Sequence, residues 1–290
     1  MSARILDGKA LAQRVRARIA DDVARLKAEH DITPGLAAVL VGEDPASQVY
    51  VGMKHRACEA AGMLSRQLEL PDDTTQEQLE ATVRELNDDE AIDGILVQLP
   101  LPDHLDPQPV QDLILHDKDV GALNPYTAGR LAVGAPTFFS CTPYGVLEIL
   151  ADADVEIAGA EVVIVGRSNL VGRPLSNMLT LKGRDATVTL AHSRTRDLGA
   201  VCRRADILVA AVGSPGLITA DMVRQGAVVI DVGTNRTEDG KLTGDVDFEA
   251  VAEVAGAITP VPGGVGPMTV TMLLQNTLEA ARVRRGLPRR

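Results

Sequence analysis

The sequence has few aromatic residues and no tryptophan. Aromatic side chains make up 2% of its 290 residues, whereas hydrophobic residues as a whole make up 45%. A chain this apolar is not intrinsically disordered, and its length provides one large domain or two modest ones. Its cores must be built from Val, Leu, Ile and Ala, a composition that favours parallel sheets covered by helices.

The sequence also lacks the clustered basic residues of a nucleic-acid-binding surface. The formal net charge is −11, and Lys and Arg are scattered except near the C-terminus. That basic tail consists of Arg282, Arg284, Arg285, Arg289 and Arg290. We interpret it as a solvated helix end, because cations favour helix C-termini. The sequence therefore predicts no nucleic-acid partner.

Cysteines are sparse and long apolar runs are missing. Cys58, Cys141 and Cys202 lie far apart and outside any zinc-ligand spacing, which argues against a disulfide framework and a metal site. No apolar run reaches the roughly 18–20 residues that span a bilayer. The first ten residues, MSARILDGKA, lack the apolar core of a signal peptide. We expect a cytoplasmic protein with no membrane contact.

Helices and strands alternate along the first half of the chain. Apolar residues at helical spacing follow Asp7, which we expect to cap a helix over residues 7–30. Strands are predicted at 35–42, 63–70 and 94–100, and helices at 47–62 and 76–87. This β-α-β-α-β alternation predicts a parallel, three-layer α/β unit.

A second alternation follows a stretch rich in Gly, Pro and small residues at 123–141, which indicates a domain boundary. Thr142 is expected to cap the next helix, with Pro143 at its first position. Strands are predicted at 161–165, 186–192, 206–212, 227–232 and near 257–261, and helices at 173–182, 195–204 and about 270–285.

The sequence VVIVGRSNLVGRPLSNML places Gly166 at the end of a predicted strand and Pro174 in the first turn of a helix. A strand–glycine turn–helix is how a doubly wound fold binds a phosphate. The spacing is not GxGxxG, so an ordinary tight turn is the alternative.

The next strand ends at His192-Ser193-Arg194, where NAD sites carry an acidic residue. Hydroxyl and guanidinium groups suit the 2′-phosphate of NADP instead, and Arg167 lies nearby in the glycine turn. The sequence therefore favours NADP over NAD. The alternative is that Arg194 and Arg196 are solvated residues at a helix entry.

Tyr50 and Lys54 are four residues apart and project from one helical face. Burial would lower the pKa of Lys54 and make the pair suitable for acid–base chemistry. The alternative is a surface lysine beside a packing tyrosine. Gln98 favours the first interpretation, because a polar amide at the C-terminal end of a buried strand faces the binding crevice of an open sheet.

Four stretches occur in the order and at the spacing of one known family. They are PASQVYVGMK (45–54), GILVQLPLP (94–102), GRSNLVGRP (166–174) and TPVPGGVGPMT (259–269). Together they resemble the bifunctional methylenetetrahydrofolate dehydrogenase/methenyltetrahydrofolate cyclohydrolase family over nearly the whole chain.

The resemblance implies an α/β fold of two domains around a cleft. The folate-binding catalytic domain would span 1–122 and be completed by 270–290, and a Rossmann-like, doubly wound NADP-binding domain would span 141–269. It implies NADP-dependent oxidation of 5,10-methylenetetrahydrofolate and hydrolysis of the methenyl product to 10-formyltetrahydrofolate. It also implies a homodimer.

The resemblance further implies roles for single residues. Lys54 would be the catalytic lysine of the hydrolysis, hydrogen-bonded by Gln98, and Tyr50 would line the folate site. The resemblance implies that NADP contacts Gly166, Arg167, Ser168, Ser193 and Thr234. The charge argument above adds Arg194 to these cofactor-binding residues. The resemblance also implies that the substrate contacts Pro262, Gly263 and Gly266.

One stretch departs from the family pattern. Residues 118–122 are Lys-Asp-Val-Gly-Ala, where the family usually has KDVDG and its second Asp contacts the pterin. Three explanations compete: a variant with weakened folate binding, a loop shift in which Asp119 or Asp117 substitutes for the missing carboxylate at Gly121, or a paralogue. Such a paralogue would bind NADP without turnover or with another substrate; a different NADP-dependent dehydrogenase is a further alternative.

Overall fold

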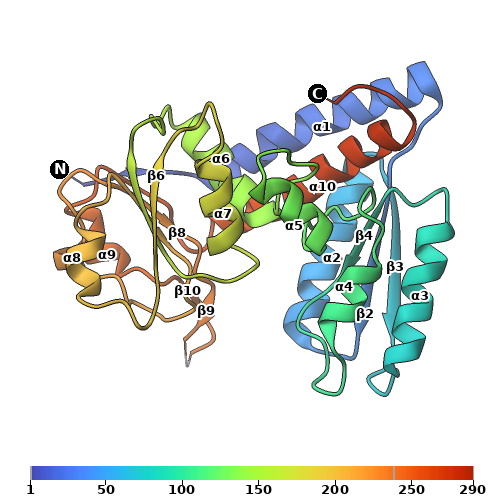
Figure 1. The fold of residues 1–290 in the computed structure, drawn as a ribbon, viewed down its shortest axis with the longest axis horizontal. Coiled ribbons are helices and arrows are strands. Elements are labelled where there is room, and N and C mark those ends of the chain that lie inside the picture. Colours follow the sequence, from blue (N-terminus) through green and yellow to red (C-terminus); the bar gives the residue numbers. More distant parts are fainter. Residues whose placement is uncertain (1, 238, 290) are drawn as a thin grey trace. The chain divides into compact units, whose positions relative to one another are not determined.

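The computed structural model describes residues 2–237 and 239–289, which form two compact units (Figure 1). The three-stranded unit comprises Arg14–Cys141 and the chain from Val270 onward. The six-stranded unit comprises the N-terminal segment up to Gln13 and Thr142–Thr269. Met1 and Arg290, the outer ends of the domain predicted from the sequence, lie outside the described residues. No helix of the described residues is both long enough and apolar enough to cross a membrane.

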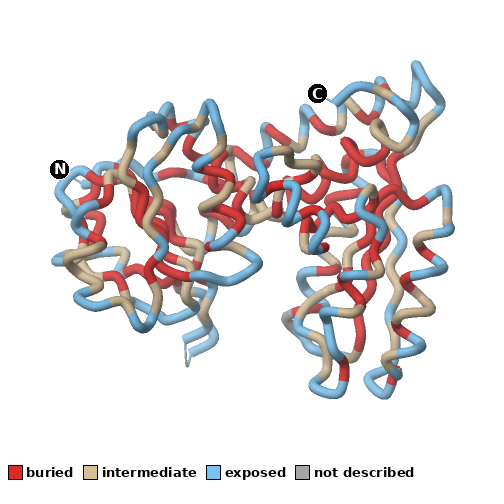
Figure 2. Tube along the Cα trace, viewed as in Figure 1, coloured by how far each residue is buried: buried red, intermediate tan, exposed pale blue. Residues whose placement is uncertain are grey.

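The three-stranded unit is built on a parallel sheet in the order β3-β2-β4. Its strands are β2 (Gly35–Val41), β3 (Leu64–Leu70) and β4 (Gly94–Val97), and its helices include α2 (Pro45–Ala60), α3 (Gln76–Asp88), α4 (Pro107–Leu113) and α5 (Pro125–Ala132). The central strand β2 is buried along its whole length (Figure 2), as its uninterrupted apolar sequence predicts. Most of α1 (Gly8–His30) and of α10 (Val265–Arg284) also belongs to this unit.

The six-stranded unit has a parallel sheet in the order β1-β11-β8-β7-β5-β6. Its strands are β1 (Arg4–Ile5), β5 (Glu161–Val165), β6 (Thr187–Ala191), β7 (Ile207–Ala210), β8 (Val228–Asp231) and β11 (Ala257–Ile258). Its helices are α6 (Cys141–Asp152), α7 (Gly172–Leu179), α8 (Leu198–Cys202) and α9 (Phe248–Ala252), with a short turn of helix η1 (Ala220–Met222) and the two-stranded ribbon β9 (Asn235–Arg236) and β10 (Leu242–Thr243). The predicted α/β class with parallel sheets is confirmed.

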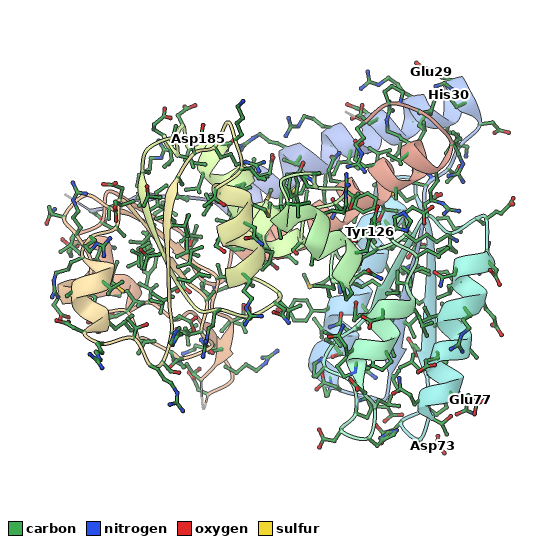
Figure 3. The ribbon with its side chains drawn as sticks, viewed as in Figure 1. Glu29, His30, Asp73, Glu77, Tyr126 and Asp185 are labelled. Atoms are coloured by element: carbon green, nitrogen blue, oxygen red, sulfur yellow. The ribbon has the colours of Figure 1, made fainter. Side chains whose placement is uncertain are left out.

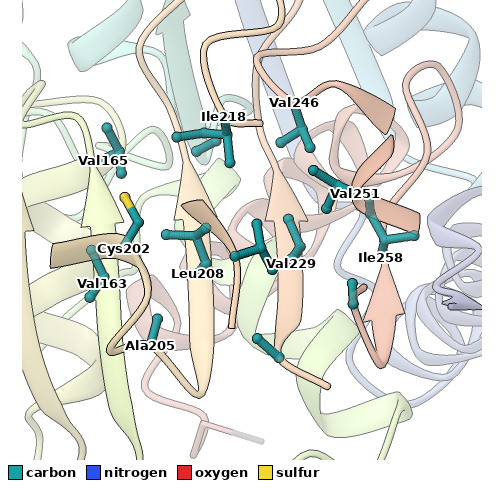
Figure 4. Packing of buried hydrophobic residues seen from close by; sticks show 14 of the residues in the cluster. Val163, Val165, Cys202, Ala205, Leu208, Ile218, Val229, Val246, Val251 and Ile258 are labelled. Carbon is teal, nitrogen blue, oxygen red and sulfur yellow. The ribbon is translucent and has the colours of Figure 1, made fainter. Parts of the chain in front are cut away.

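The core of the six-stranded unit contains aliphatic side chains from neighbouring strands. Val163, Leu208, Val229 and Ile258 line up across the sheet beneath the loops and short helices that cover it (Figure 4). The N-terminal segment joins this unit because β1 pairs with β11. The sequence analysis assigned this N-terminal segment to the domain at 1–122, whereas the structure groups it with the six-stranded unit. A two-residue strand that pairs with a partner about 250 residues away leaves no periodic signal in the sequence.

Two local predictions differ from the structure at helix starts, and the stretch predicted as a domain boundary contains a helix of its own. The α2 helix begins before the expected Ser47, because the Asp44 carboxylate accepts a hydrogen bond from the Ser47 amide at 2.7 Å and caps the helix there. Thr142 is not a cap, because α6 already begins at Cys141. The stretch 123–141 contains α5, which Asn124 caps and Pro125 opens.

The buried ammonium of Lys118 joins the segment after α4 to the end of α3. It is fully buried and donates to the carbonyl oxygens of Leu86, Asn87 and Asp89 at 2.9, 2.7 and 2.7 Å. These carbonyls lie at the C-terminal end of α3, where the helix has no intrahelical donors to offer and where the helix dipole favours a cation. Burial lowers the pKa of Lys118, and these acceptors compensate the buried charge.

We expect Lys118→Met to lower the free energy of unfolding by about 3 kcal/mol, because it leaves the three carbonyl groups without their donor. Urea denaturation followed by circular dichroism measures the change. Lys27→Met, at an exposed position of α1, is the matched control and should change stability by less than about 0.5 kcal/mol. Equal effects of the two substitutions would show that the Lys118 contacts contribute no net stability.

Candidate active site

Lys54 and Gln98 come together in the three-stranded unit. Lys54 lies on α2 and is partly buried, and Gln98 follows directly after β4. The Lys54 Nζ donates to Gln98 Oε1 at 2.6 Å. The Gln98 Nε2 donates to the carbonyl oxygen of Leu99 at 2.5 Å, which orients the amide with its oxygen toward the lysine. The sequence therefore located both partners of this contact, although Gln98 lies just beyond the strand rather than within it.

The Lys54 amine loses its proton more readily than an ordinary lysine. Burial lowers the pKa of Lys54 to about 8. Burial also raises the pKa of the Cys141 thiol to about 12, so the thiol stays neutral beside the lysine. A lysine with this pKa exchanges protons near neutral pH, which an ordinary exposed lysine does poorly.

Tyr50 lies one turn before Lys54 on α2. Its side chain is 38% exposed, and the neighbouring Val49 and Met53 are also exposed. An exposed aromatic and apolar surface next to a tuned amine is suited to a flat, partly apolar ligand.

The loop after α4 uses its acidic side chains for its own structure. The Asp119 carboxylate is buried and accepts from the amides of Leu123 and Asn124 at 3.1 and 2.9 Å. Burial raises the pKa of Asp119. Asp117 forms an ion pair with Arg284 at 2.7 Å. Both carboxylates are therefore engaged within the protein, which disfavours the loop-shift explanation for the missing acidic residue.

Gly121 and Ala122 lie in the same loop and are buried. A Cβ atom at Gly121 would lie 3.5 Å from Leu96 Cδ1, which is ordinary van der Waals contact. Ala122 adopts a left-handed conformation with φ of 55°, which glycine tolerates better. Beyond this loop, Tyr126 lies at the start of α5 (Figure 3). Its ring packs edge to face on His116, with ring centroids 4.5 Å apart.

Two residues that sequence reasoning missed complete the surroundings of this loop. The Asn276 side chain, from α10, donates to the carbonyl oxygens of Val120 and Phe139, each at 2.8 Å. The Cys141 thiol donates to the Val120 carbonyl at 3.4 Å and is a neighbour of Lys54. An asparagine within an apolar helical stretch was the available signal for Asn276, whereas an isolated cysteine gave none.

The six-stranded unit carries the glycine turn. Gly166 follows β5 with φ of 126°, and a Cβ atom there would collide with the carbonyl oxygen of Ala211. A Cβ at Gly172 would likewise collide with the carbonyl oxygen of Gly166. Arg167 and Ser168 are exposed between these glycines, just before α7. The first turn of α7 has no side-chain cap. Its Arg173 and Leu175 amides already donate to the carbonyl oxygens of Ser168 and Val171 at 3.1 and 2.9 Å, and Pro174 has no amide hydrogen, which leaves the Gly172 amide as the donor suited to a phosphate.

The other predicted residues of this unit lie in loops. Ser193 and Arg194 are exposed directly beyond β6, and Thr234 is exposed beyond β8. Pro262 and Gly266 are exposed, and Gly263 has φ of 107°. The Gly263 carbonyl accepts from the Lys9 amide at 2.8 Å, so this loop packs on the start of α1. Among the residues that the structure describes, no group of His, Cys, Asp and Glu is arranged to hold a metal ion.

These features define a class of protein: a two-unit α/β protein with a lysine–glutamine pair in one unit and a dinucleotide-type glycine turn in the other. The tetrahydrofolate dehydrogenase/cyclohydrolase catalytic-domain model matches residues 6–121, and the NAD(P)-binding-domain model of the same family matches residues 140–285. The chain therefore belongs to the tetrahydrofolate dehydrogenase/cyclohydrolase family.

Individual relatives are similar over the full chain. The bifunctional protein FolD of Moorella thermoacetica is 58% identical over 282 residues, covering 97% of this chain and 100% of that protein. The crystal structure of the bifunctional enzyme FolD from Campylobacter jejuni is 44% identical with a TM-score of 0.94, covering 98% and 100% of the two chains. The Trypanosoma brucei enzyme, complexed with NADP cofactor and inhibitor, is 39% identical with a TM-score of 0.94, covering 99% of each chain.

The unusual environment of Lys54 is directly measurable. We expect its amine to titrate at about pH 8, as measured from the pH dependence of acylation by an amine-selective reagent with peptide mass spectrometry. Gln98→Leu should lower this pKa further, because it removes the acceptor that stabilises the ammonium. Gln48→Leu, at an exposed position of the same helix, should leave it unchanged. A Lys54 titration near the ordinary value of about 10.4 would contradict the buried environment.

Proposed function

We propose that the protein oxidises 5,10-methylenetetrahydrofolate with NADP and hydrolyses the methenyl product to 10-formyltetrahydrofolate. The observation that carries the proposal is the Lys54–Gln98 hydrogen bond of 2.6 Å together with the pKa of about 8 at Lys54. It lies in the part of the chain that matches the family's catalytic domain. The relatives named as bifunctional FolD support the same pair of activities.

Lys54 moves the proton in the hydrolysis. The methenyl carbon is already electrophilic, so water adds to it when a base accepts the proton of the attacking water. The neutral Lys54 amine accepts that proton, and cleavage of one carbon–nitrogen bond then leaves the formyl group on the other nitrogen. Gln98 holds the amine in place through its oriented amide oxygen. A pKa of about 8 leaves a useful fraction of neutral amine near neutral pH.

The six-stranded unit would hold NADP, which supplies hydride acceptance when bound. The residues present fit a phosphate-bearing dinucleotide: the turn at Gly166 is free of side-chain bulk, and Arg167 and Ser168 are exposed beside the uncapped start of α7. Ser193 and Arg194 would contact the 2′-phosphate. Thr234 would contact the cofactor from the loop after β8.

The remaining assignments concern the folate. Tyr50 would line the folate site next to Lys54, and Pro262, Gly263 and Gly266 would contact the substrate from a loop whose glycines allow close backbone approach. Asp119 would shape the loop that faces the pterin, since its carboxylate already caps backbone amides.

Gly121 favours a second candidate, a member of the family with weakened or changed folate specificity. The position lacks a carboxylate, and the neighbouring side chains of Leu96 and Leu123 are apolar. A paralogue that binds NADP without turning over reduced folate would show the same sequence. The intact Lys54–Gln98 contact supports the bifunctional enzyme over this alternative.

Cytoplasmic location and a homodimeric state belong to the proposal. The three cysteines are free and two of them are buried, which is compatible with a reducing compartment. The homodimer follows from the family resemblance, and sedimentation of the purified protein measures it.

The proposed activity is tested by NADP-dependent oxidation of 5,10-methylenetetrahydrofolate in the parent and in Gly121→Asp. We expect the parent to turn over and Gly121→Asp to lower KM for the folate about tenfold, because a charge-assisted hydrogen bond to the pterin is gained. A Cβ atom at this position meets only ordinary van der Waals contacts.

Gly121→Asn is the matched control, because it adds similar bulk without a charge and should recover much less affinity. Combining Gly121→Asp with Ala122→Gly restores the family's Asp-Gly pair and relieves the left-handed alanine. If neither the parent nor these variants oxidise the folate, the paralogue becomes the better description.

Cofactor preference has a separate test. We expect Arg194→Gln to weaken NADP binding about tenfold and to leave NAD binding unchanged, because it removes a charged partner of the 2′-phosphate. Isothermal titration with both dinucleotides measures this. Arg196→Gln, two residues further on and also exposed, should have little effect. If the parent bound NAD as tightly as NADP or more tightly, the predicted preference for NADP would be wrong.

A further inference from the structure

One buried carboxylate in the six-stranded unit binds the backbone of one loop and a side chain of a second segment. Asp245 has no exposed surface. Its Oδ2 accepts from the amides of Val212 and Gly213 at 2.7 and 3.0 Å. Its Oδ1 accepts from the Ser214 amide at 2.8 Å and from Asn235 Nδ2 at 2.9 Å. The four donors come from the loop after β7 and from the segment after β8.

A second buried carboxylate holds the first in place. Asp231, at the end of β8, accepts from the amides of Gly233 and Asp245 at its Oδ1 and from the Val246 amide at its Oδ2, at 2.9, 2.9 and 3.0 Å. Burial raises the pKa of Asp231 to about 6. A Cβ atom at Gly233 would collide with the Asp245 side chain, and one at Gly244 would collide with Asp231. The backbone is thus fitted tightly around both carboxylates.

These loops lie at the edge of the sheet where open α/β folds bind ligands. The strands β5, β7 and β8 are parallel neighbours, so the loops that follow them share one edge. The glycine turn after β5 packs on the loop after β7, because a Cβ atom at Gly166 would collide with the Ala211 carbonyl oxygen. The Ala211 amide also donates to the Val165 carbonyl at 2.8 Å. A change at Asp245 therefore reaches the turn proposed to bind the dinucleotide phosphates.

We propose that Asp245 is a positioning residue for the dehydrogenase reaction, because its carboxylate holds the loops after β7 and β8 in the conformation that receives the dinucleotide. The proposal rests on the proposed NADP-dependent function. A carboxylate suits the task because it only accepts hydrogen bonds, and here it meets four donors. Asparagine has nearly the same shape but would point its own donor at two of them.

The test compares the parent with Asp245→Asn in three measurements. Fluorescence titration with NADPH gives the dissociation constant, initial rates give KM for NADP, and hydrolysis of methenyltetrahydrofolate is followed without any dinucleotide. We expect the dissociation constant and KM to rise about tenfold or more, because charge-assisted hydrogen bonds to the loop amides are lost. Hydrolysis should stay within about twofold of the parent, because it uses Lys54 of the other unit.

Asp247→Asn is the matched control. It makes the same chemical change two residues further along, where Asp247 is exposed and caps α9, and asparagine caps helices nearly as well. It should leave all three measurements at the parent's values. If Asp245→Asn does not fold, Asn235→Ala takes its place: it removes one of the four donors and should weaken NADPH binding about threefold, again with unchanged hydrolysis.

The outcomes separate the inference from the function on which it rests. Unchanged NADPH binding in a folded Asp245→Asn, or in Asn235→Ala where that is the folded variant, overturns the inference. A parallel loss of hydrolysis and dinucleotide binding also overturns it, because the carboxylate would then serve only general stability. A parent that does not bind NADPH contradicts the proposed dehydrogenase function itself, and the inference with it.

Discussion

The buried ammonium of Lys118 fixes the loop that contains Asp119 and Gly121. The Lys118 side chain binds the end of α3, and the Lys118 backbone carbonyl accepts a hydrogen bond from the Ile95 amide of β4 at 2.9 Å. The same residue therefore ties the loop both to a helix end and to the strand that leads to Gln98. From this point, Asp119 caps the amides that follow it, and Asn276 holds the Val120 carbonyl. The loop has few ways to move without leaving buried polar groups unpaired.

The rigidity of this loop bears on the absence, at Gly121, of the Asp that the family usually has. A loop shift would bring Asp119 or Asp117 to the pterin only by breaking the amide contacts of the first or the ion pair of the second. The loop is also firm enough to keep Ala122 at φ of 55°, a conformation that costs an alanine about 1–2 kcal/mol. The backbone is thus the one expected for Asp-Gly, while the side chain that would use it is missing. Both observations support the proposal that the loop backbone is kept while the pterin contact at position 121 is lost.

The sequence predicted those features of the fold that have a local cause. Apolar runs such as Gly35–Val41 and Glu161–Val165 predicted strands, and the four-residue spacing of Tyr50 and Lys54 predicted a shared helical face. It did not predict the pairing of β1 with β11 or the contacts of Asn276, because each joins residues far apart in the chain. Gln98 was found because an amide at a strand end is conspicuous. Asp231 and Asp245 were not, since a buried carboxylate looks like a loop residue until its donors are seen.

Lys118, which is fully buried, and Lys54, which is partly buried, differ in the number of hydrogen-bond acceptors that they meet. Burial lowers the pKa of both, but Lys118 meets three carbonyl oxygens at the negative end of a helix. Lys54 has the amide oxygen of Gln98 as its hydrogen-bond acceptor within the described part of the chain. An ammonium with three acceptors keeps its proton, because its hydrogen bonds depend on the charge. An ammonium with one acceptor loses less hydrogen-bond stabilisation when it is deprotonated. The neutral amine that results is the form that can accept a proton from water.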